Sequence, residues 1–133
     1  MIPLSFAQRR LWFLNKLEGP SATYNMAGAL RLRGPLDRAA MAAAIHDVVD
    51  RHEPLRTVFP EVGAEPCQRI LDVDHAGVEL EVARPDDLTA AMRRAANHVF
   101  DLLDRPPFRA TLFVVGPDEH VLMIVGHHIA GDG

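Results

Sequence analysis

Hydrophobic and polar positions repeat with helical spacing in three segments of the chain. The first segment begins after Ser5, which is followed three residues later by Gln8 in the pattern of a capping box, and Gly19-Pro20 ends it. The second begins after Asp37, a good N-cap residue. Its apolar residues recur at helical spacing and predict a buried side: Met41, Ile45, Val48 and Val49.

The third segment is the longest of the predicted helices. It begins near Asp86 or Asp87, and Pro106-Pro107 is expected to end it because proline cannot continue a helix. The predicted buried stripe runs along most of this stretch through Leu88, Met92, Ala95, Val99 and Leu102.

Strand-like patterns fill the remaining segments. Residues 24–33 alternate, with Met26, Gly28, Leu30 and Leu32 on one face. Residues 55–59, 68–71 and 78–82 predict short strands, and the apolar runs 108–115 and 120–128, joined by a turn-forming segment, predict an antiparallel hairpin. The expected fold class is α/β, an α+β two-layer sandwich in which helices pack on a mixed sheet.

Composition narrows the classes of protein. A chain of 133 residues with 48% hydrophobic content suits one domain with a real core. The net charge of −4 argues against a nucleic-acid partner. Cys67 is the single cysteine, which is compatible with a reducing compartment, and the sequence contains neither a secretory signal pattern nor an apolar run long enough for a membrane. We expect a soluble, cytoplasmic protein.

The residues with the clearest chemical potential lie at 127–133, directly after an apolar run. If the strand persists, His127 and His128 point to opposite faces, so one imidazole can face a cleft while the other helps to hold the turn. Asp132 could orient an imidazole, pair with an arginine or cap a turn. Gly131 and Gly133 are interpreted as residues that allow a tight loop of positive φ. A metal site is the competing interpretation, and the opposed histidines count against it.

Three ordered motifs give this chain a family resemblance. The pattern HHxxxDG at 127–133, the stretch SFAQRRLWFL at 5–14 and the stretch RHEPLRTVF at 51–59 resemble motifs of the condensation domains of non-ribosomal peptide synthetases. The resemblance implies the N-terminal lobe of a chloramphenicol acetyltransferase-like fold. It also implies that residues 1–133 are an incomplete domain, truncated just after HHxxxDG, which lacks its C-terminal lobe.

The resemblance also implies a reaction and its residues. Such a domain joins a donor acyl or peptidyl thioester to the amine of an acceptor aminoacyl group. Both substrates arrive on phosphopantetheine arms of carrier domains in adjacent synthetase modules, with no directly bound cofactor or metal. The functional histidine maps onto His128. Structural support of the active site maps onto His127, Gly133 and a pair of Asp132 with Arg56.

Related classes remain as alternatives. Heterocyclization domains carry aspartate in place of the two histidines, so His127 and His128 argue against that class. An epimerization domain shares HHxxxDG but differs in its N-terminal motif, and a non-catalytic carrier-binding or scaffold role is the alternative from another class. Residues 1–133 alone are expected to be inactive.

Overall fold

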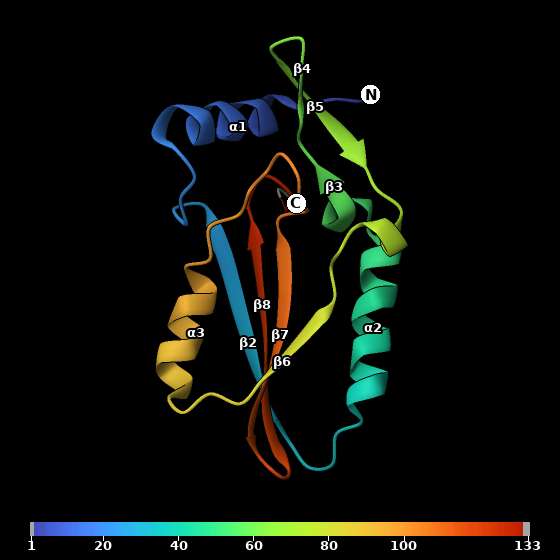
Figure 1. Ribbon diagram of the computed structural model, residues 1–133, viewed down its shortest axis with the longest axis vertical. Helices are drawn as coiled ribbons and strands as arrows, with labels where there is room; N and C mark the ends of the chain where they lie inside the picture. Colours follow the sequence, from blue (N-terminus) through green and yellow to red (C-terminus); the bar gives the residue numbers. More distant parts are fainter. Residues whose placement is uncertain (1, 132–133) are drawn as a thin grey trace.

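Residues 2–131 are described by the computed structural model (Figure 1). Three α-helices lie in this range: α1 (Phe6–Glu18), α2 (Arg38–Arg51) and α3 (Leu88–Ala96). There are also two short 3-10 helices in this range: η1 (Glu53–Arg56) lies between α2 and the next strand, and η2 (Val73–His75) lies between two strands. The expected α/β class, with helices packed on a mixed sheet, is confirmed.

The main sheet has the strand order β2-β8-β7-β6. The expected hairpin is β7 (Phe108–Gly116) and β8 (Glu119–His127), which pair antiparallel. β2 (Asn25–Arg33) pairs antiparallel with β8, and β6 (Leu80–Ala83) pairs parallel with β7, so the sheet is mixed. β8 is therefore a central strand, and its end carries the histidine pair.

A smaller sheet lies close to the start of the chain. β5 (Glu65–Ile70) pairs antiparallel with three two-residue strands, β1 (Ile2–Pro3), β3 (Thr57–Val58) and β4 (Glu61–Val62). In Figure 1 this sheet and α1 lie beyond the upper end of β8.

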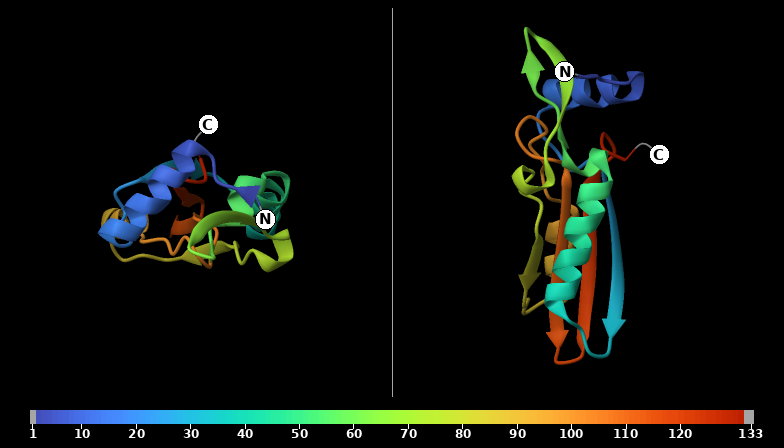
Figure 2. Two further views of the ribbon diagram at one scale, coloured as in Figure 1. Left: turned by 90° about the horizontal axis from the view of Figure 1, so that it is seen from above. Right: turned by 90° about the vertical axis from the view of Figure 1, so that its right-hand side faces the viewer.

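α3 packs on one face of the main sheet, against β2 and β8, and α2 packs on the other face, beside β6 and β7, which leaves that face of β2 and β8 open (Figure 2). Alternate residues of β7 and β8 point to opposite sides, so the sheet contributes to two cores. One core contains Trp12 of α1, Ala91 of α3 and the sheet residues Phe113, Val121, Met123 and Val125. The other contains Ile45 and Val49 of α2 with Phe108 and Ala110.

The predicted helix starts are confirmed. Ser5 caps α1, and both bonds of the capping box with Gln8 are present. The carboxylates of Asp37 and Asp87 cap α2 and α3 by accepting the amides of the residues three positions on. Of the predicted buried side of α2, Ile45 and Val49 are buried, whereas Val48 is 42% exposed.

The prediction for the end of the third helix is wrong. α3 ends at Ala96, ten residues before Pro106, and Asn97 is its C-cap. The side-chain amide of Asn25, on β2, donates to the carbonyls of Ala96 and His98 at 3.0 and 2.7 Å. This side chain, distant in the sequence, satisfies carbonyls at and just beyond the helix end, and it therefore stabilises the end of α3 at Ala96. Val99, predicted to be buried, is 49% exposed, while Leu102 is buried outside the helix.

Short strands are displaced from their predicted positions. Leu55 and Arg56 belong to η1, because Pro54 fits the start of a helical turn, and only Thr57–Val58 form a strand. The strand predicted at 68–71 is the longer β5, and the strand predicted at 78–82 begins at Leu80.

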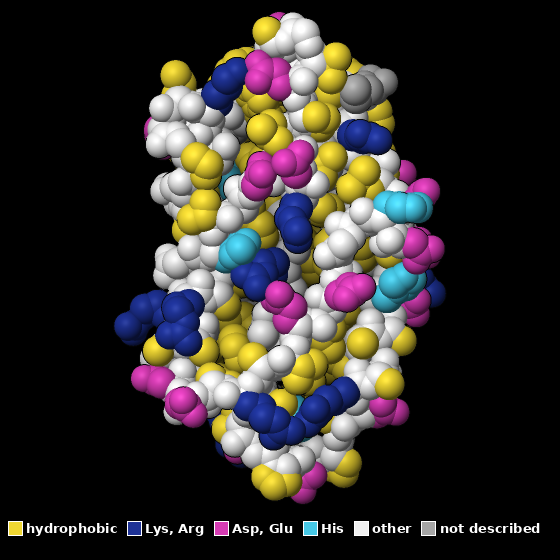
Figure 3. Space-filling model, viewed as in Figure 1, with side chains coloured by type: hydrophobic (Ala, Val, Ile, Leu, Met, Phe, Trp, Pro, Cys, Tyr) yellow, Lys and Arg dark blue, Asp and Glu magenta, His cyan; other side chains and the backbone are white. Residues whose placement is uncertain are grey.

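On the face shown in Figure 3, charged side chains of both signs are interspersed with hydrophobic ones.

Candidate functional site at the end of β8

The backbone at the end of β8 is held from both sides. The His127 amide donates to the carbonyl of Pro107 at 3.1 Å, and the His128 amide donates to the carbonyl of Tyr24 at 2.9 Å. Tyr24 immediately precedes β2, and Pro107 immediately precedes β7. The histidine pair therefore rests on the two strands that flank β8.

The two imidazoles face opposite environments, as predicted from their adjacency. His127 is the last residue of β8 and is 2% exposed, whereas His128 begins the following turn and is exposed. His128 is thus available to a ligand, while His127 is part of the protein interior.

His127 is a structural acceptor in the neutral form. Its Nδ1 accepts the backbone N–H of Ile129 at 3.0 Å, which requires that Nδ1 carry no proton. Burial, with a smaller contribution from the charge of His128, lowers the pKa of His127 to about 4. At neutral pH the bond from Ile129 is therefore intact.

Backbone bonds close the turn that carries His128. The amides of Ala130 and Gly131 donate to the carbonyls of His127 and His128 at 3.0 and 3.2 Å. Ile129, which lies between His128 and Ala130 in the sequence, has its side chain fully buried in the core that contains Trp12. An exposed imidazole is therefore flanked by a buried histidine and a buried isoleucine, which fixes the backbone from which it projects.

Gly131 lies close to Met26 of β2. It does not adopt the positive φ that the sequence suggested, so that prediction is wrong. A Cβ at this position would lie 2.7 Å from Cε of Met26, which is the end of a flexible side chain, so a larger residue here would require only that this side chain move.

The structure places Arg56 at the junction between α2 and β5. Its Nε donates to the carbonyl of Asp50 at 3.3 Å, and its Nη1 donates to the carbonyl of Leu71 at 2.9 Å. Asp132 and Gly133 lie outside the described residues. The predicted pair of Asp132 with Arg56 stays a prediction.

Sequence reasoning missed two residues that support the site. Tyr24 was assigned only to a strand, yet its carbonyl holds His128 and its ring lies 6.2 Å from that of His127. Gln8 was assigned only to a capping box, yet it also donates to the Ile129 carbonyl at 3.3 Å. The capping-box pattern locates Gln8 on a helix end, but no local pattern shows that this end meets the histidine turn.

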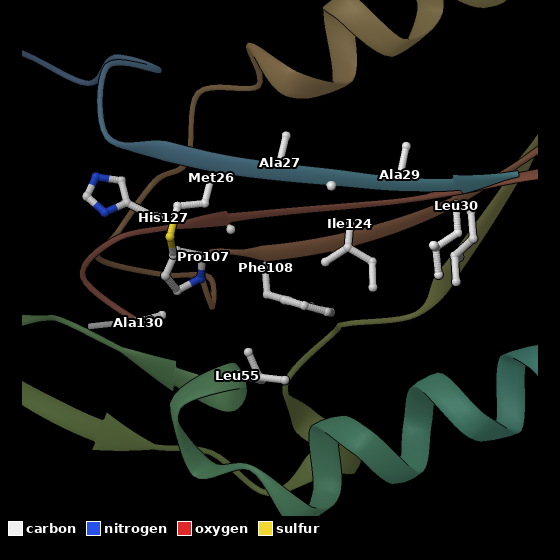
Figure 4. Close-up of a pocket in the computed structure, with 14 residues that line it drawn as sticks. Met26, Ala27, Ala29, Leu30, Leu55, Pro107, Phe108, Ile124, His127 and Ala130 are labelled. Carbon is white, nitrogen blue, oxygen red and sulfur yellow. The ribbon is translucent and has the colours of Figure 1, made fainter. Parts of the chain in front are cut away.

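An apolar groove runs along the sheet beside the site (Figure 4). It has a volume of about 500 Å³, and Leu55 faces Phe108 and Ile124 across it. His127, Ala130 and Gly131 also line the groove, so the histidine turn borders it.

Within residues 2–131, no group of three or more His, Cys, Asp and Glu side chains is placed to hold a metal ion. In the same range, no helix combines the length and apolar character needed to span a bilayer.

Comparison with known proteins identifies the family. The chain belongs to the condensation domain family, whose sequence pattern matches residues 1–133. It is 57% identical, over 99% of its length, to a probable non-canonical non-ribosomal peptide synthetase, CymA, of Salinispora arenicola, and 54% identical to a dimodular non-ribosomal peptide synthase of Bacillus subtilis. The chain spans only 2% and 6% of these two proteins.

Solved structures confirm the fold. The X-domain from teicoplanin biosynthesis is 40% identical with a TM-score of 0.82, over 96% of this chain and 28% of that one. The starter condensation domain of rhizomide synthetase RzmA is 26% identical with a TM-score of 0.85, over 96% of this chain and 32% of that one. A mutant of the RzmA domain was solved in complex with C8-CoA and Leu-SNAC.

Proposed function

We propose that this chain is the N-terminal part of a condensation domain that forms an amide bond between two carrier-tethered substrates. The amine nitrogen of the acceptor aminoacyl group attacks the carbonyl carbon of the donor thioester. The new C–N bond replaces the C–S bond, the amine loses a proton, and the donor carrier's phosphopantetheine leaves as the thiol. The observation that carries the proposal is the exposed His128 imidazole on a turn held at both sides.

His128 is the proposed catalytic residue, and it can act in two ways. As a general base it takes the proton of the attacking amine on an unprotonated imidazole nitrogen. As a hydrogen-bonding group it orients the amine toward the thioester, so that proximity supplies most of the rate. His128→Gln distinguishes these roles, because its side-chain oxygen can accept the N–H of the amine but cannot take its proton.

The substrates and partners follow from the same proposal. The donor acyl or peptidyl thioester and the acceptor arrive on phosphopantetheine arms of carrier domains of neighbouring modules. The ligands named for the RzmA domain, C8-CoA and Leu-SNAC, support this choice. The groups that react belong to the two substrates, so the domain needs no nucleophile of its own.

A complete reaction chamber is proposed to require the C-terminal lobe. The chain covers 28% to 32% of the solved domains with which it aligns. Holding two arms in register needs walls on both sides, and losing one wall removes most of the advantage of proximity. Residues 1–133 alone are therefore expected to give no dipeptidyl product.

The test uses the complete domain with both carriers loaded and follows dipeptidyl product by mass spectrometry. His128→Ala is expected to lower kcat by roughly 10²- to 10⁴-fold while the domain stays folded, as expected for loss of a group that handles a proton. His75→Ala, at an exposed histidine outside the three motifs, is the matched control and keeps full turnover. A folded His128→Ala domain with full turnover contradicts the role of His128.

A partner-binding domain without turnover is the second candidate. The X-domain from teicoplanin biosynthesis, solved in complex with OxyB, is 37% identical to this chain. Under this alternative the wild-type complete domain forms no dipeptide but still binds a protein partner. An epimerization domain would instead invert a carrier-tethered residue, which chiral analysis of the product detects.

A further inference from the structure

The side-chain amide of Gln8 joins three separate parts of the chain. Its Oε1 accepts the backbone N–H of Ser5 at 2.9 Å and the side-chain N–H of Gln68, on β5, at 3.1 Å. Its Nε2 donates to the carbonyl of Ile129 at 3.3 Å, across 121 positions of sequence. The start of α1, the small sheet and the histidine turn therefore meet at this one amide.

The orientation of this amide is fixed by its partners. The Ser5 backbone N–H can only donate, so the atom that it contacts must be the oxygen of Gln8. The Ile129 carbonyl can only accept, so it must face the nitrogen. A flipped amide would break both contacts, and the link to Ile129 is thus tied to the link that caps α1.

Ile129 is consequently held by side chains on both of its backbone groups. Its N–H donates to Nδ1 of His127, and its carbonyl accepts from Gln8. Its own side chain is fully buried. Because the peptide group before Ile129 includes the carbonyl of His128, restraining Ile129 restrains the backbone that carries the exposed imidazole.

We propose that Gln8 is a positioning residue for His128, acting through the Ile129 carbonyl. The inference rests on the proposed function for the part that concerns turnover. Figure 1 shows the arrangement that makes it possible, because α1 crosses the molecule beyond the end of β8. Gln8 therefore has two roles: it takes part in the capping box of α1, and it supports the turn that carries His128.

Two substitutions separate the role of Gln8 in supporting the turn from its role in the capping box of α1. Gln8→Glu keeps an oxygen to accept from Ser5 and Gln68, and its negative charge suits a helix N-terminus. An ionised carboxylate has no N–H for the Ile129 carbonyl, so that bond is lost and two acceptors face each other. Ser5→Ala does the reverse: it removes the hydroxyl that accepts the backbone N–H of Gln8 at 3.2 Å and leaves the bond from the Gln8 side chain to Ile129 in place.

The experiment compares these variants in the complete condensation domain with loaded carriers. Hydrogen exchange by mass spectrometry follows the peptide that contains residues 127–131, and single-turnover kinetics follow the chemical step. Gln8→Glu is expected to speed exchange in that peptide and to lower kcat by roughly 10- to 100-fold, the scale of a misplaced catalytic group, with KM for the carriers unchanged. Ser5→Ala is expected to lower the melting temperature and leave both readouts as in the wild type.

The outcomes separate this proposal from the proposed function. Unchanged exchange in Gln8→Glu overturns the link, and faster exchange with wild-type kcat overturns its role in positioning His128. An equal loss of kcat in Ser5→Ala also overturns it, because a general loss of helix stability then explains the effect. If His128→Ala keeps full turnover, the catalytic role of His128 fails, whereas the exchange comparison still decides whether Gln8 restrains the turn.

Discussion

The backbone N–H of Ile129 donates to Nδ1 of His127, two residues earlier in the chain, at 3.0 Å. This bond exists only while Nδ1 is unprotonated, so protonation of the buried imidazole removes one of the hydrogen bonds that hold the turn. Burial and, to a smaller extent, the charge of His128 lower the pKa of His127 to about 4, so the folded protein disfavours that protonation.

Acid should therefore destabilise the fold through His127. An unfolded histidine binds a proton near pH 6.5, and the folded one only near pH 4. Between these values the unfolded state holds more protons, so the free energy of unfolding is highest above about pH 6.5 and falls as pH is lowered toward 4. His98 acts in the same direction, because burial and Arg109 lower its pKa too.

His127→Asn tests this account. The Asn side-chain oxygen can replace Nδ1 as acceptor for Ile129 but does not titrate, so this variant should lose part of the pH dependence of the melting temperature between pH 6.5 and 4. The part due to His98 should remain. His52→Asn, at an exposed position, should follow the wild-type curve. A His127→Asn curve parallel to that of the wild type would show that His127 does not cause this pH dependence. His127→Ala, which removes the acceptor altogether, should mainly lower stability and soluble yield.

Arg56 should contribute to stability through two backbone carbonyls and through Asp132. Arg56→Ala removes donors to Asp50 and Leu71, and we expect it to lower the free energy of unfolding by about 1 to 3 kcal/mol. Arg51→Ala, at an exposed arginine at the end of α2, is the matched control with a small effect.

The predicted pair requires a double-mutant cycle. Asp132→Asn should lower the melting temperature, and the double variant with Arg56→Ala should cost less than the two single changes together. Strict additivity in chemical denaturation would show that Arg56 and Asp132 do not interact directly.

Local patterns predicted those features whose causes are local. The capping box of α1, the hairpin and the opposed directions of His127 and His128 each depend on residues a few positions apart. The prediction for the end of α3 was wrong. The apolar spacing continues to Leu102, whereas the bond from Asn25 and the C-cap at Asn97 favour an earlier end of the helix. Such a contact depends on the assembled fold.

The candidate site also has one part that local sequence predicts and another part that depends on the assembled fold. His128 follows from a motif of seven residues, and its exposure follows from strand geometry. Its support by Gln8 and Tyr24 depends on how α1 and β2 pack at the end of β8. Periodicity can place each residue on its element, but it contains no information on which element ends meet.

The uncovered face of β2 and β8 should make the isolated 133-residue chain self-associate. Leu30 is 64% exposed and Ile124 is 36% exposed, and both line the apolar groove. Contiguous apolar surface of this kind favours association in water. Sedimentation velocity should show a concentration-dependent oligomer, and Leu30→Glu should shift it toward monomer. Leu17→Glu is the matched control, since Leu17 on α1 is 82% exposed and lies outside the groove. A wild-type chain that stays monomeric at all concentrations, or an equal effect of Leu17→Glu, would show that the groove does not drive association.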